Sequence, residues 1–205
     1  MPSLSDLNGH HEDLAARVVR YAERLGWRAV PVAYHEVQGG EALKLATDDT
    51  GLYVRTLPDM VVTDGEEAVL LELKTHVTRG RHDATPELYP IVAATVLYRA
   101  LGVRTLYVYE DPVAGISGAW WAHAVFLEVP VSRIFVGAQR QDWALHLARI
   151  RRWQSMGLVP ANVEVAVVRT RGSGDPFVVV PEEYLRTLLP WHYVLEELMR
   201  REVAR

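Results

Sequence analysis

Hydrophobic and polar positions in the first half of the chain predict helices and strands in a definite order. Apolar residues recur at helical spacing from about residue 5 to residue 25, and Gly26 follows them. Runs rich in Val, Leu and Tyr predict strands at 27–37, 52–62, 66–77 and 103–111, with a second helix at 86–102. The resulting α-β-β-β-α-β order predicts an α/β protein with a mixed central β-sheet flanked by helices.

The second half of the chain continues with strands and helices and shows no linker or internal repeat. The pattern predicts strands at 119–131, 133–139, 162–170 and 176–180, and helices at 140–157, 181–189 and 190–204. We expect the strands at 162–170 and 176–180 to pair as a hairpin. We therefore predict one domain over residues 1–205, with a core at about 5–111 and a C-terminal α/β extension at about 112–205.

Charged residues stand inside the stretch LPDMVVTDGEEAVLLELKTH, residues 57–76, whose strands are otherwise apolar on both faces. Side chains on a strand alternate, so Glu72 and Lys74 lie side by side on one face. An exposed cross-strand charge pair is one interpretation of these residues. A buried strand, however, carries charges only where they are paired or bind a metal, and this favours a functional site.

The turn between the two strands decides whether Asp59 joins this pair. The dipeptide Asp64-Gly65 predicts a two-residue hairpin loop. With that loop, Asp59 lies opposite Leu70, on the same face as Glu72 and diagonal to it, at roughly 7–8 Å. A three-residue loop would instead turn Asp59 to the other face.

Two carboxylates at that separation can share a hard cation. Mg²⁺ takes oxygen ligands at about 2.0–2.1 Å and keeps water and substrate phosphate as its other ligands. A lysine beside it can orient or deprotonate the attacking water, or stabilise negative charge on the phosphoryl group. The stretch therefore predicts metal-dependent phosphate chemistry.

Pro58-Asp59, twelve intervening residues and Glu72-Leu73-Lys74 resemble the signature of the PD-(D/E)xK nuclease superfamily. The element order over about residues 10–110 also resembles the common core of that family. The resemblance implies a restriction-endonuclease-like fold and a Mg²⁺-dependent deoxyribonuclease in which Mn²⁺ can substitute. It implies that Asp59 and Glu72 are metal ligands, that the Leu73 carbonyl is a further ligand, and that Lys74 is the catalytic lysine.

Many members of this superfamily add a glutamate from the first helix. Glu12 is our candidate for that position, with Glu23 second. The alternative is that Glu12 complements the positive end of the helix dipole. Exonucleases of the RecB type carry a Gln and a Tyr one turn apart in the following helix, and residues 86–102 contain no Gln. The compact core is instead similar to archaeal Holliday junction resolvases and to the VRR nuclease group.

Arg79, Arg81 and His76 follow the lysine closely and are our candidates for contacting DNA. The alternative is a solvated loop with a surface histidine. The function that the resemblance implies is hydrolysis of DNA phosphodiester bonds by an endonuclease, including a structure-specific one. The alternatives are a non-catalytic DNA-binding or assembly subunit of the same fold, or an exonuclease of the same superfamily. A homodimer is one expected arrangement, because cutting two strands usually needs two active sites.

Composition narrows the picture further. The chain of 205 residues is 49% hydrophobic and 23% charged, which is typical of a globular protein. It has no cysteine, and its histidines lack the spacing typical of zinc sites, so neither disulfides nor a dedicated zinc site are expected. The formal net charge of −4 means that any attraction to DNA must be local. Without a signal-peptide pattern or an apolar stretch of about 20 residues, we expect a cytoplasmic protein with no membrane contact.

Overall fold

The structure is a computed structural model that describes residues 4–32, 56–76, 80–138, 143–169 and 175–203. Its first half contains α1 (Leu4–Arg24), β1 (Arg28–Pro31), β2 (Met60–Thr63), β3 (Ala68–Thr75), α4 (Leu88–Leu101), β4 (Thr105–Asp111) and β5 (Ile116–Trp121). Its second half contains η2 (Ala122–Ala124), α5 (Val125–Glu128), β6 (Arg133–Gly137), α6 (Trp143–Ser155), β7 (Glu164–Val168), β8 (Phe177–Val178), α7 (Glu182–Leu185) and α8 (Trp191–Val203). The predicted strand residues 33–37 and 52–55 lie outside the described residues.

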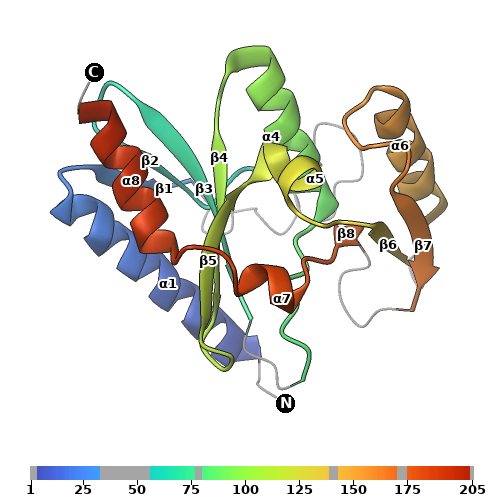
Figure 1. The fold of residues 1–205 in the computed structure, drawn as a ribbon, viewed down its shortest axis with the longest axis horizontal. Coiled ribbons are helices and arrows are strands. Elements are labelled where there is room, and N and C mark those ends of the chain that lie inside the picture. Colours follow the sequence, from blue (N-terminus) through green and yellow to red (C-terminus); the bar gives the residue numbers. More distant parts are fainter. Residues whose placement is uncertain (1–3, 33–55, 77–79, 139–142, 170–174, 204–205) are drawn as a thin grey trace.

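A five-stranded sheet in the order β1-β2-β3-β4-β5 forms the centre of the molecule (Figure 1). β3 and β4 are parallel and the other neighbours are antiparallel. The crossover from β3 to the parallel strand β4 runs through α4, as a parallel connection requires. This architecture confirms the predicted mixed sheet flanked by helices and is consistent with a restriction-endonuclease-like fold.

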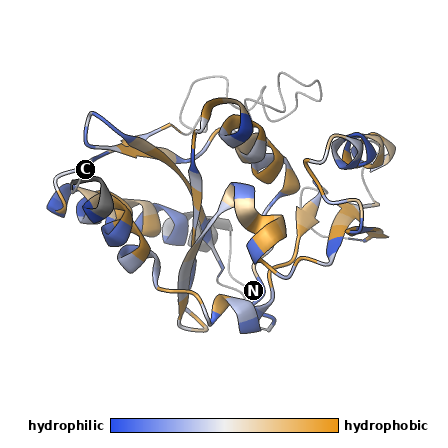
Figure 2. Ribbon diagram, turned by 45° about the horizontal axis from the view of Figure 1, so that its top comes forward, coloured by the Kyte–Doolittle hydropathy of each residue, from blue (hydrophilic) through white to orange (hydrophobic). Residues whose placement is uncertain are grey.

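Two helix layers cover the sheet. On one face, α1 and α8 bury Leu14, Val18 and Leu195 against apolar residues of β2, β3 and β4. On the other face, α4 and the helical turn after β5 pack against Tyr107 and Tyr109 of β4. Figure 2 shows α1 and α8 with a mixture of hydrophilic and hydrophobic residues, as expected of helices that bury only one face.

Glycines end both of the helices predicted in the first half. Gly26 has φ of 84° after α1, and Gly102 has φ of 72° after α4, where its N–H donates to the Tyr98 carbonyl at 2.9 Å. These left-handed conformations are inexpensive only for glycine. The predicted ends of the two helices are therefore confirmed.

A second, smaller sheet in the order β7-β6-β8 lies beyond α4 and corrects one prediction (Figure 1). The hairpin predicted between 162–170 and 176–180 is wrong, because β6 lies between β7 and β8. β6 and β7 are parallel, and α6 forms the crossover between them. β8 pairs antiparallel with β6 on the side of β6 opposite β7. Isolated bridges also join Phe177 to Glu87 and Val180 to Ala84.

The strand predicted at 119–131 is also wrong in its second part. β5 ends at Trp121, and residues 122–128 form short helical turns. Ala122, Val125 and Val129 are buried at spacings of three and four residues, which matches one face of a helix. Burial of these residues against α4 outweighs the preference of Val and Phe for strands.

None of the helices described here has the length and hydrophobicity needed to cross a membrane. β5 belongs to the central sheet and α8 packs on it, so parts of the C-terminal extension contribute directly to the core.

Candidate active site

The loop between β2 and β3 is longer than predicted. Thr63 pairs with Ala68, so the loop has four residues, 64–67, and the predicted two-residue loop is wrong. The Asp64 carboxylate accepts N–H bonds from Glu66 and Glu67, each at 2.9 Å, and Thr63 Oγ1 accepts one from Gly65 at 3.0 Å. Asp64 thus makes a side-chain turn of its own, which widens the loop.

The longer loop shifts the strand register by two residues, and this leaves Asp59 on the predicted face. Met60 pairs with Leu71, so extending the ladder by one residue places Asp59 directly opposite Glu72. An even shift preserves the face of every side chain, whereas an odd shift reverses it. Directly opposed residues are also closer than diagonal ones, so the observed register places Asp59 nearer to Glu72 than the predicted register does.

Asp59 is held by contacts from three segments. Its Oδ2 accepts the Leu73 N–H at 2.7 Å, and its backbone carbonyl accepts the Val32 N–H at 2.9 Å. His11 Nε2 on α1 lies 3.6 Å from the same Oδ2. Burial favours a protonated Asp59, but the contact with His11 and the Leu73 N–H prevail and hold the pKa of Asp59 below its usual value. The Asp59 carboxylate in turn raises the pKa of His11.

Pro58 has a clear consequence for the adjacent strand. Extending the same register places Pro58 opposite Leu73. A proline has no N–H, so it cannot donate to the Leu73 carbonyl as an ordinary ladder residue would. The regular ladder therefore ends where Asp59 and Glu72 meet, and the Leu73 carbonyl faces this end.

Glu72 and Lys74 form an ion pair in the middle of the site. Lys74 Nζ lies 3.0 Å from Glu72 Oε1, and Glu72 is only 6% exposed. Burial raises the pKa of Glu72 to about 7, with the nearby charge of Asp59 acting in the same direction and Lys74 opposing both. Burial disfavours the Lys74 ammonium, but the charges of Glu72, Glu87 and Asp59 outweigh it and raise the pKa of Lys74.

Glu87 and Tyr107 belong to this electrostatic environment and were not found from the sequence. The negative charge of Glu87, just before α4, raises the pKa of Glu72, Lys74 and Tyr107 alike. Tyr107 pairs with Glu72 across β3 and β4, and its buried hydroxyl has no hydrogen-bond partner among the described residues. Neither position is evident from local spacing, because both depend on how β4 and α4 meet β3.

The structure brings His11 of α1 to the site, next to the predicted Glu12. His11 lies three residues before Leu14 and seven before Val18, on the stripe of α1 that faces the sheet, so the helical spacing could have identified it. Glu12 is exposed, and within the described residues no hydrogen bond or ion pair joins it to Asp59, Glu72 or Lys74. Glu23 is also exposed and lies twelve residues from His11, about 18 Å along the helix.

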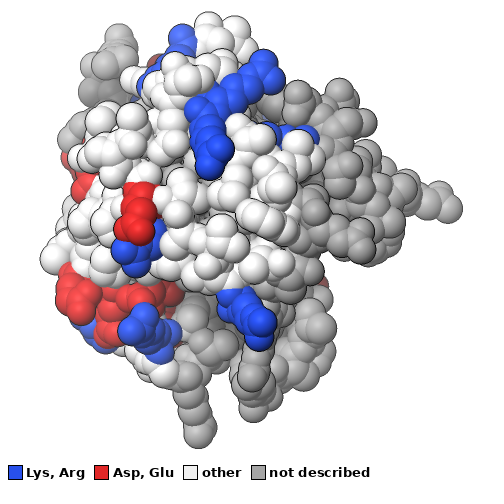
Figure 3. Space-filling model, turned by 90° about the vertical axis from the view of Figure 1, so that its right-hand side faces the viewer, with Lys and Arg blue, Asp and Glu red and all other residues white. Residues whose placement is uncertain are grey.

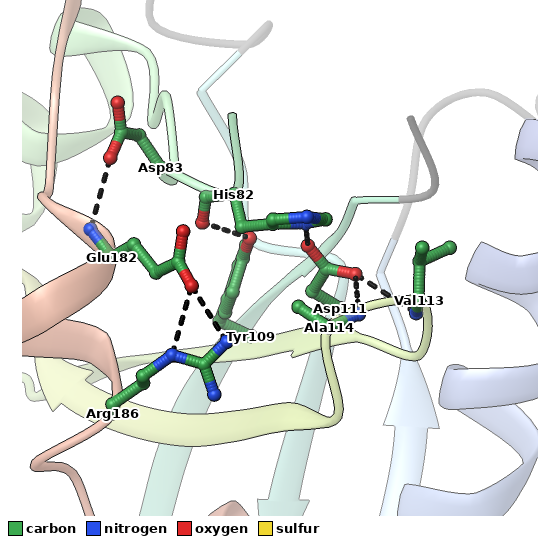
Figure 4. A network of polar contacts seen from close by, with 8 residues as sticks. All are labelled: His82, Asp83, Tyr109, Asp111, Val113, Ala114, Glu182 and Arg186. Carbon is green, nitrogen blue, oxygen red and sulfur yellow. Dashed lines mark hydrogen bonds and ion pairs between the residues drawn. The ribbon is translucent and has the colours of Figure 1, made fainter. Parts of the chain in front are cut away.

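Of the three candidate DNA contacts, the structure describes His76 and Arg81. Arg79 lies outside the described residues, and Arg81 is exposed. His76 follows β3 on the side of Lys74, and its ring lies 6.0 Å from that of His82, measured between centroids. Figure 4 shows His82 turned toward Asp111, with His82 Nδ1 at 2.7 Å from Asp111 Oδ2. His76 is therefore part of a histidine and aspartate cluster beside the site.

The face formed by α6 and the second sheet shows a different charge pattern. Figure 3 shows its basic side chains in small separate groups, divided by uncharged surface. Among the described residues, Arg133 is paired with Glu164 at 2.5 Å, and Arg151 and Arg152 are exposed on α6. No continuous basic stripe is visible on the described part of this face.

Comparison with known proteins adds little to this geometry. No family model matches the chain, and no curated protein sequence matches it. A solved structure that it resembles is Hjc, a Holliday junction resolvase from the archaeal hyperthermophile Archaeoglobus fulgidus. The TM-score is 0.36 and the identity 14%, over 53% of this chain and 73% of that one. A likeness of this size carries no argument about function.

Proposed function

We propose that the protein is a metal-dependent DNA endonuclease of the PD-(D/E)xK type that hydrolyses phosphodiester bonds. The observation that carries this proposal is the meeting of Asp59, Glu72 and Lys74 at the point where Pro58 ends the β2–β3 ladder. A buried glutamate with a raised pKa, beside two further carboxylates, is an arrangement that attracts a cation.

The residues present fit a hard divalent cation. Asp59 and Glu72 offer carboxylate oxygens and Leu73 a backbone carbonyl, and oxygen is the ligand type that Mg²⁺ and Mn²⁺ prefer. Mg²⁺, with Mn²⁺ as a substitute, would supply a Lewis acid that polarises phosphate oxygens and lowers the pKa of a bound water. Asp59 and Glu72 repel each other when both are charged, and a cation held between them would relieve that repulsion.

Lys74 acts in this proposal as a cation and hydrogen-bond donor. Its raised pKa keeps the amine protonated at neutral pH, so it does not serve as a general base in the state described. A protonated amine can donate to the attacking water or to a phosphate oxygen, and its charge stabilises the negative charge that develops during hydrolysis. His11 holds Asp59 from the α1 side, and Glu12 remains our candidate for an acidic group contributed when substrate is bound.

The substrate in this proposal is DNA with an unusual structure, such as a four-way junction. Arg79, Arg81 and His76 follow Lys74 in the sequence, and His76 comes directly after β3, where a phosphate backbone that enters the site would continue. The chain's formal charge of −4 makes such local contacts necessary. A homodimer would place two sites on the two strands of one DNA molecule.

The test is a cleavage assay on labelled four-way junction, duplex, single-stranded and supercoiled DNA, each with Mg²⁺, with Mn²⁺ and with chelator. Wild type is compared with Asp59→Asn, which keeps an oxygen to accept the Leu73 N–H while it removes the charge. We expect cutting that needs metal and falls by about 10³-fold or more in Asp59→Asn. The preferred DNA then identifies the substrate.

A matched control is Glu66→Gln, which removes an exposed carboxylate from the nearby loop. It should cut at the wild-type rate. Cutting by Asp59→Asn at the wild-type rate would refute the site. A folded wild-type protein that binds these DNAs and cuts none of them would instead identify the non-catalytic binding subunit.

A further inference from the structure

Two imidazoles and one carboxylate meet beside the candidate active site but outside it. His76 follows β3, Asp111 ends β4, and His82 comes from the segment that leads to α4. One ligand atom from each of the three residues lies within 4.8 Å of the other two. Asp111 is completely buried, whereas His76 and His82 are half-buried, so the group is open to solvent on the histidine side.

The strand register separates this cluster from Asp59 and Glu72. Glu72 and Tyr107 are paired across the parallel strands, and the cluster begins four residues further along each strand, at His76 and Asp111. At about 3.3 Å per residue, this places the two groups roughly 13 Å apart along the strands. One cation cannot bind to both groups, because ligand bonds are only about 2–2.6 Å long.

The cluster is held in place by neighbouring backbone groups. Asp111 Oδ1 accepts the N–H of Val113 at 3.0 Å and of Ala114 at 2.9 Å, which leaves Oδ2 directed at His82 (Figure 4). The Tyr109 hydroxyl donates to the His82 carbonyl at 3.4 Å. Outer contacts of this kind orient metal ligands before the metal arrives.

The ligand types identify the class of metal. Imidazole nitrogens with one carboxylate suit Zn²⁺ and its first-row neighbours, whereas Mg²⁺ requires oxygen ligands. In a tetrahedral site with bonds of about 2.0–2.1 Å, neighbouring ligand atoms are about 3.3 Å apart. His82 Nδ1 and Asp111 Oδ2 are now 2.7 Å apart as a hydrogen-bonded pair. Small side-chain rotations would therefore suffice for a cation to replace the shared proton.

We propose that His76, His82 and Asp111 form a second metal site, which binds Zn²⁺ or a similar transition metal and leaves one position to solvent. The cation would tie the ends of β3 and β4 to residues 80–84. That segment also contacts the residues that follow β8, because Ala84 bridges Val180 and Asp83 accepts the N–H of Glu182, at the start of α7, at 3.0 Å. Binding should therefore stabilise the contact between the central sheet and this part of the chain.

The test measures Zn²⁺ and Co²⁺ binding to the untagged full chain, and does not depend on cleavage. Calorimetry is carried out on wild type and on Asp59→Asn, in which the active-site carboxylates are weakened as a competing site. We expect at least one Zn²⁺ per chain in wild type and one in Asp59→Asn, with an intense visible Co²⁺ spectrum in that variant, typical of fewer than six ligands. His82→Ala and His76→Ala should each weaken binding at least about tenfold.

Two further variants make the result decisive. Asp111→Asn keeps an oxygen for the Val113 and Ala114 N–H groups while it removes the charged ligand, so it should weaken Zn²⁺ binding in a folded protein. His10→Ala removes an exposed histidine of α1 and should change nothing. A folded wild type that binds no Zn²⁺, or binding that is unchanged in both His76→Ala and His82→Ala, would overturn the proposal, as would loss of binding in His10→Ala.

Discussion

Two glutamates on neighbouring strands, the buried Glu72 of β3 and the partly buried Glu110 of β4, have opposite environments. On the face covered by α1 and α8, Glu110 accepts two N–H bonds from Arg17 and one from Trp191 Nε1 at 2.7 Å. On the other face, Glu72 has the Lys74 ammonium at 3.0 Å and two further carboxylates, Asp59 and Glu87, as charged neighbours. Glu110 is thus satisfied by fixed donors, whereas Glu72 has the single ammonium of Lys74 beside it together with the charges of two further carboxylates.

This difference separates a structural carboxylate, Glu110, from Glu72, which we propose to be functional. The partners of Glu110 come from α1 and α8, so that carboxylate joins both terminal helices to the sheet. A buried acid with incomplete partners costs stability, and folded proteins keep such groups where they perform chemistry. The same residue type, on adjacent strands of one sheet, is therefore expected to respond oppositely to the same substitution.

The largest expected effect comes from replacing each glutamate by glutamine. Glu72→Gln should lower metal-dependent DNA cleavage by about 10³-fold, because it removes a charged ligand at the reacting centre. Glu110→Gln, folded and assayed in the same way, should retain the wild-type kcat. Equal losses of cleavage activity in the two variants would contradict the different roles assigned to Glu72 and Glu110.

The next effect concerns stability, where Glu110→Gln should have the larger effect and Glu72→Gln the smaller. Glu110→Gln should lower the free energy of unfolding by about 2 kcal/mol, because charged hydrogen bonds to Arg17 and Trp191 are weakened. For a chain of this size, that corresponds to a fall in Tm of about 4–8 °C. Glu72→Gln should unfold at or above the wild-type temperature in a thermal scan with chelator, since it removes a costly buried charge. A lower Tm for Glu72→Gln than for Glu110→Gln would contradict this ranking.

A smaller effect is expected from pH. The pKa of Glu72 is about 7 in the folded protein and near 4.5 when unfolded, so the folded state binds the proton more tightly. The stability that this proton contributes is complete below pH 4.5 and is lost as the pH rises through 7, by less than about 3 kcal/mol. Denaturant titrations of wild type from pH 5 to 8 should show this decline, and Glu72→Gln should show less of it.

The smallest effect involves His11. The raised pKa of His11 keeps its imidazolium beside Asp59 at mildly acidic pH, where it competes with a metal cation for the carboxylate. His11→Gln should therefore tighten Mn²⁺ binding at pH 6 by about threefold and leave it unchanged at pH 8.5, as measured by calorimetry. An identical change in Mn²⁺ affinity at pH 6 and at pH 8.5 would show that the charge of His11 does not cause the effect.

The fold was largely predictable because its core elements have strong local signals. Helical spacing that ends in glycine located α1 and α4, and short apolar runs located the strands of the central sheet. The pairing of the second sheet was not predictable in this way. Residues 162–180 have the pattern of a hairpin, but α6 lets β7 pair with β6 instead, and no local feature of the sequence encodes that choice.

The part of the candidate site that depends on the β2–β3 hairpin alone was predictable from the sequence. Alternation placed Glu72 beside Lys74, and Asp59 kept its face because the longer loop shifted the register by an even number. The closer approach of Asp59 could not be foreseen, because it depends on hydrogen bonds that the Asp64 side chain makes within the loop. Glu87 is near the site only because α4 packs against the sheet, and the local sequence pattern does not show that packing.

The contact between Asp59 and Leu73 makes the site observable from inside the sheet. The Leu73 N–H is protected by a side chain, at a place where the rest of the ladder uses backbone carbonyls. A ligand that turns the Asp59 carboxylate away from Leu73 would expose this one amide to deuterium exchange, while its neighbours in β3 stay protected. The Leu73 amide is thus a built-in isotopic probe, through which occupancy of the site can be followed without substrate, dye or cleavage.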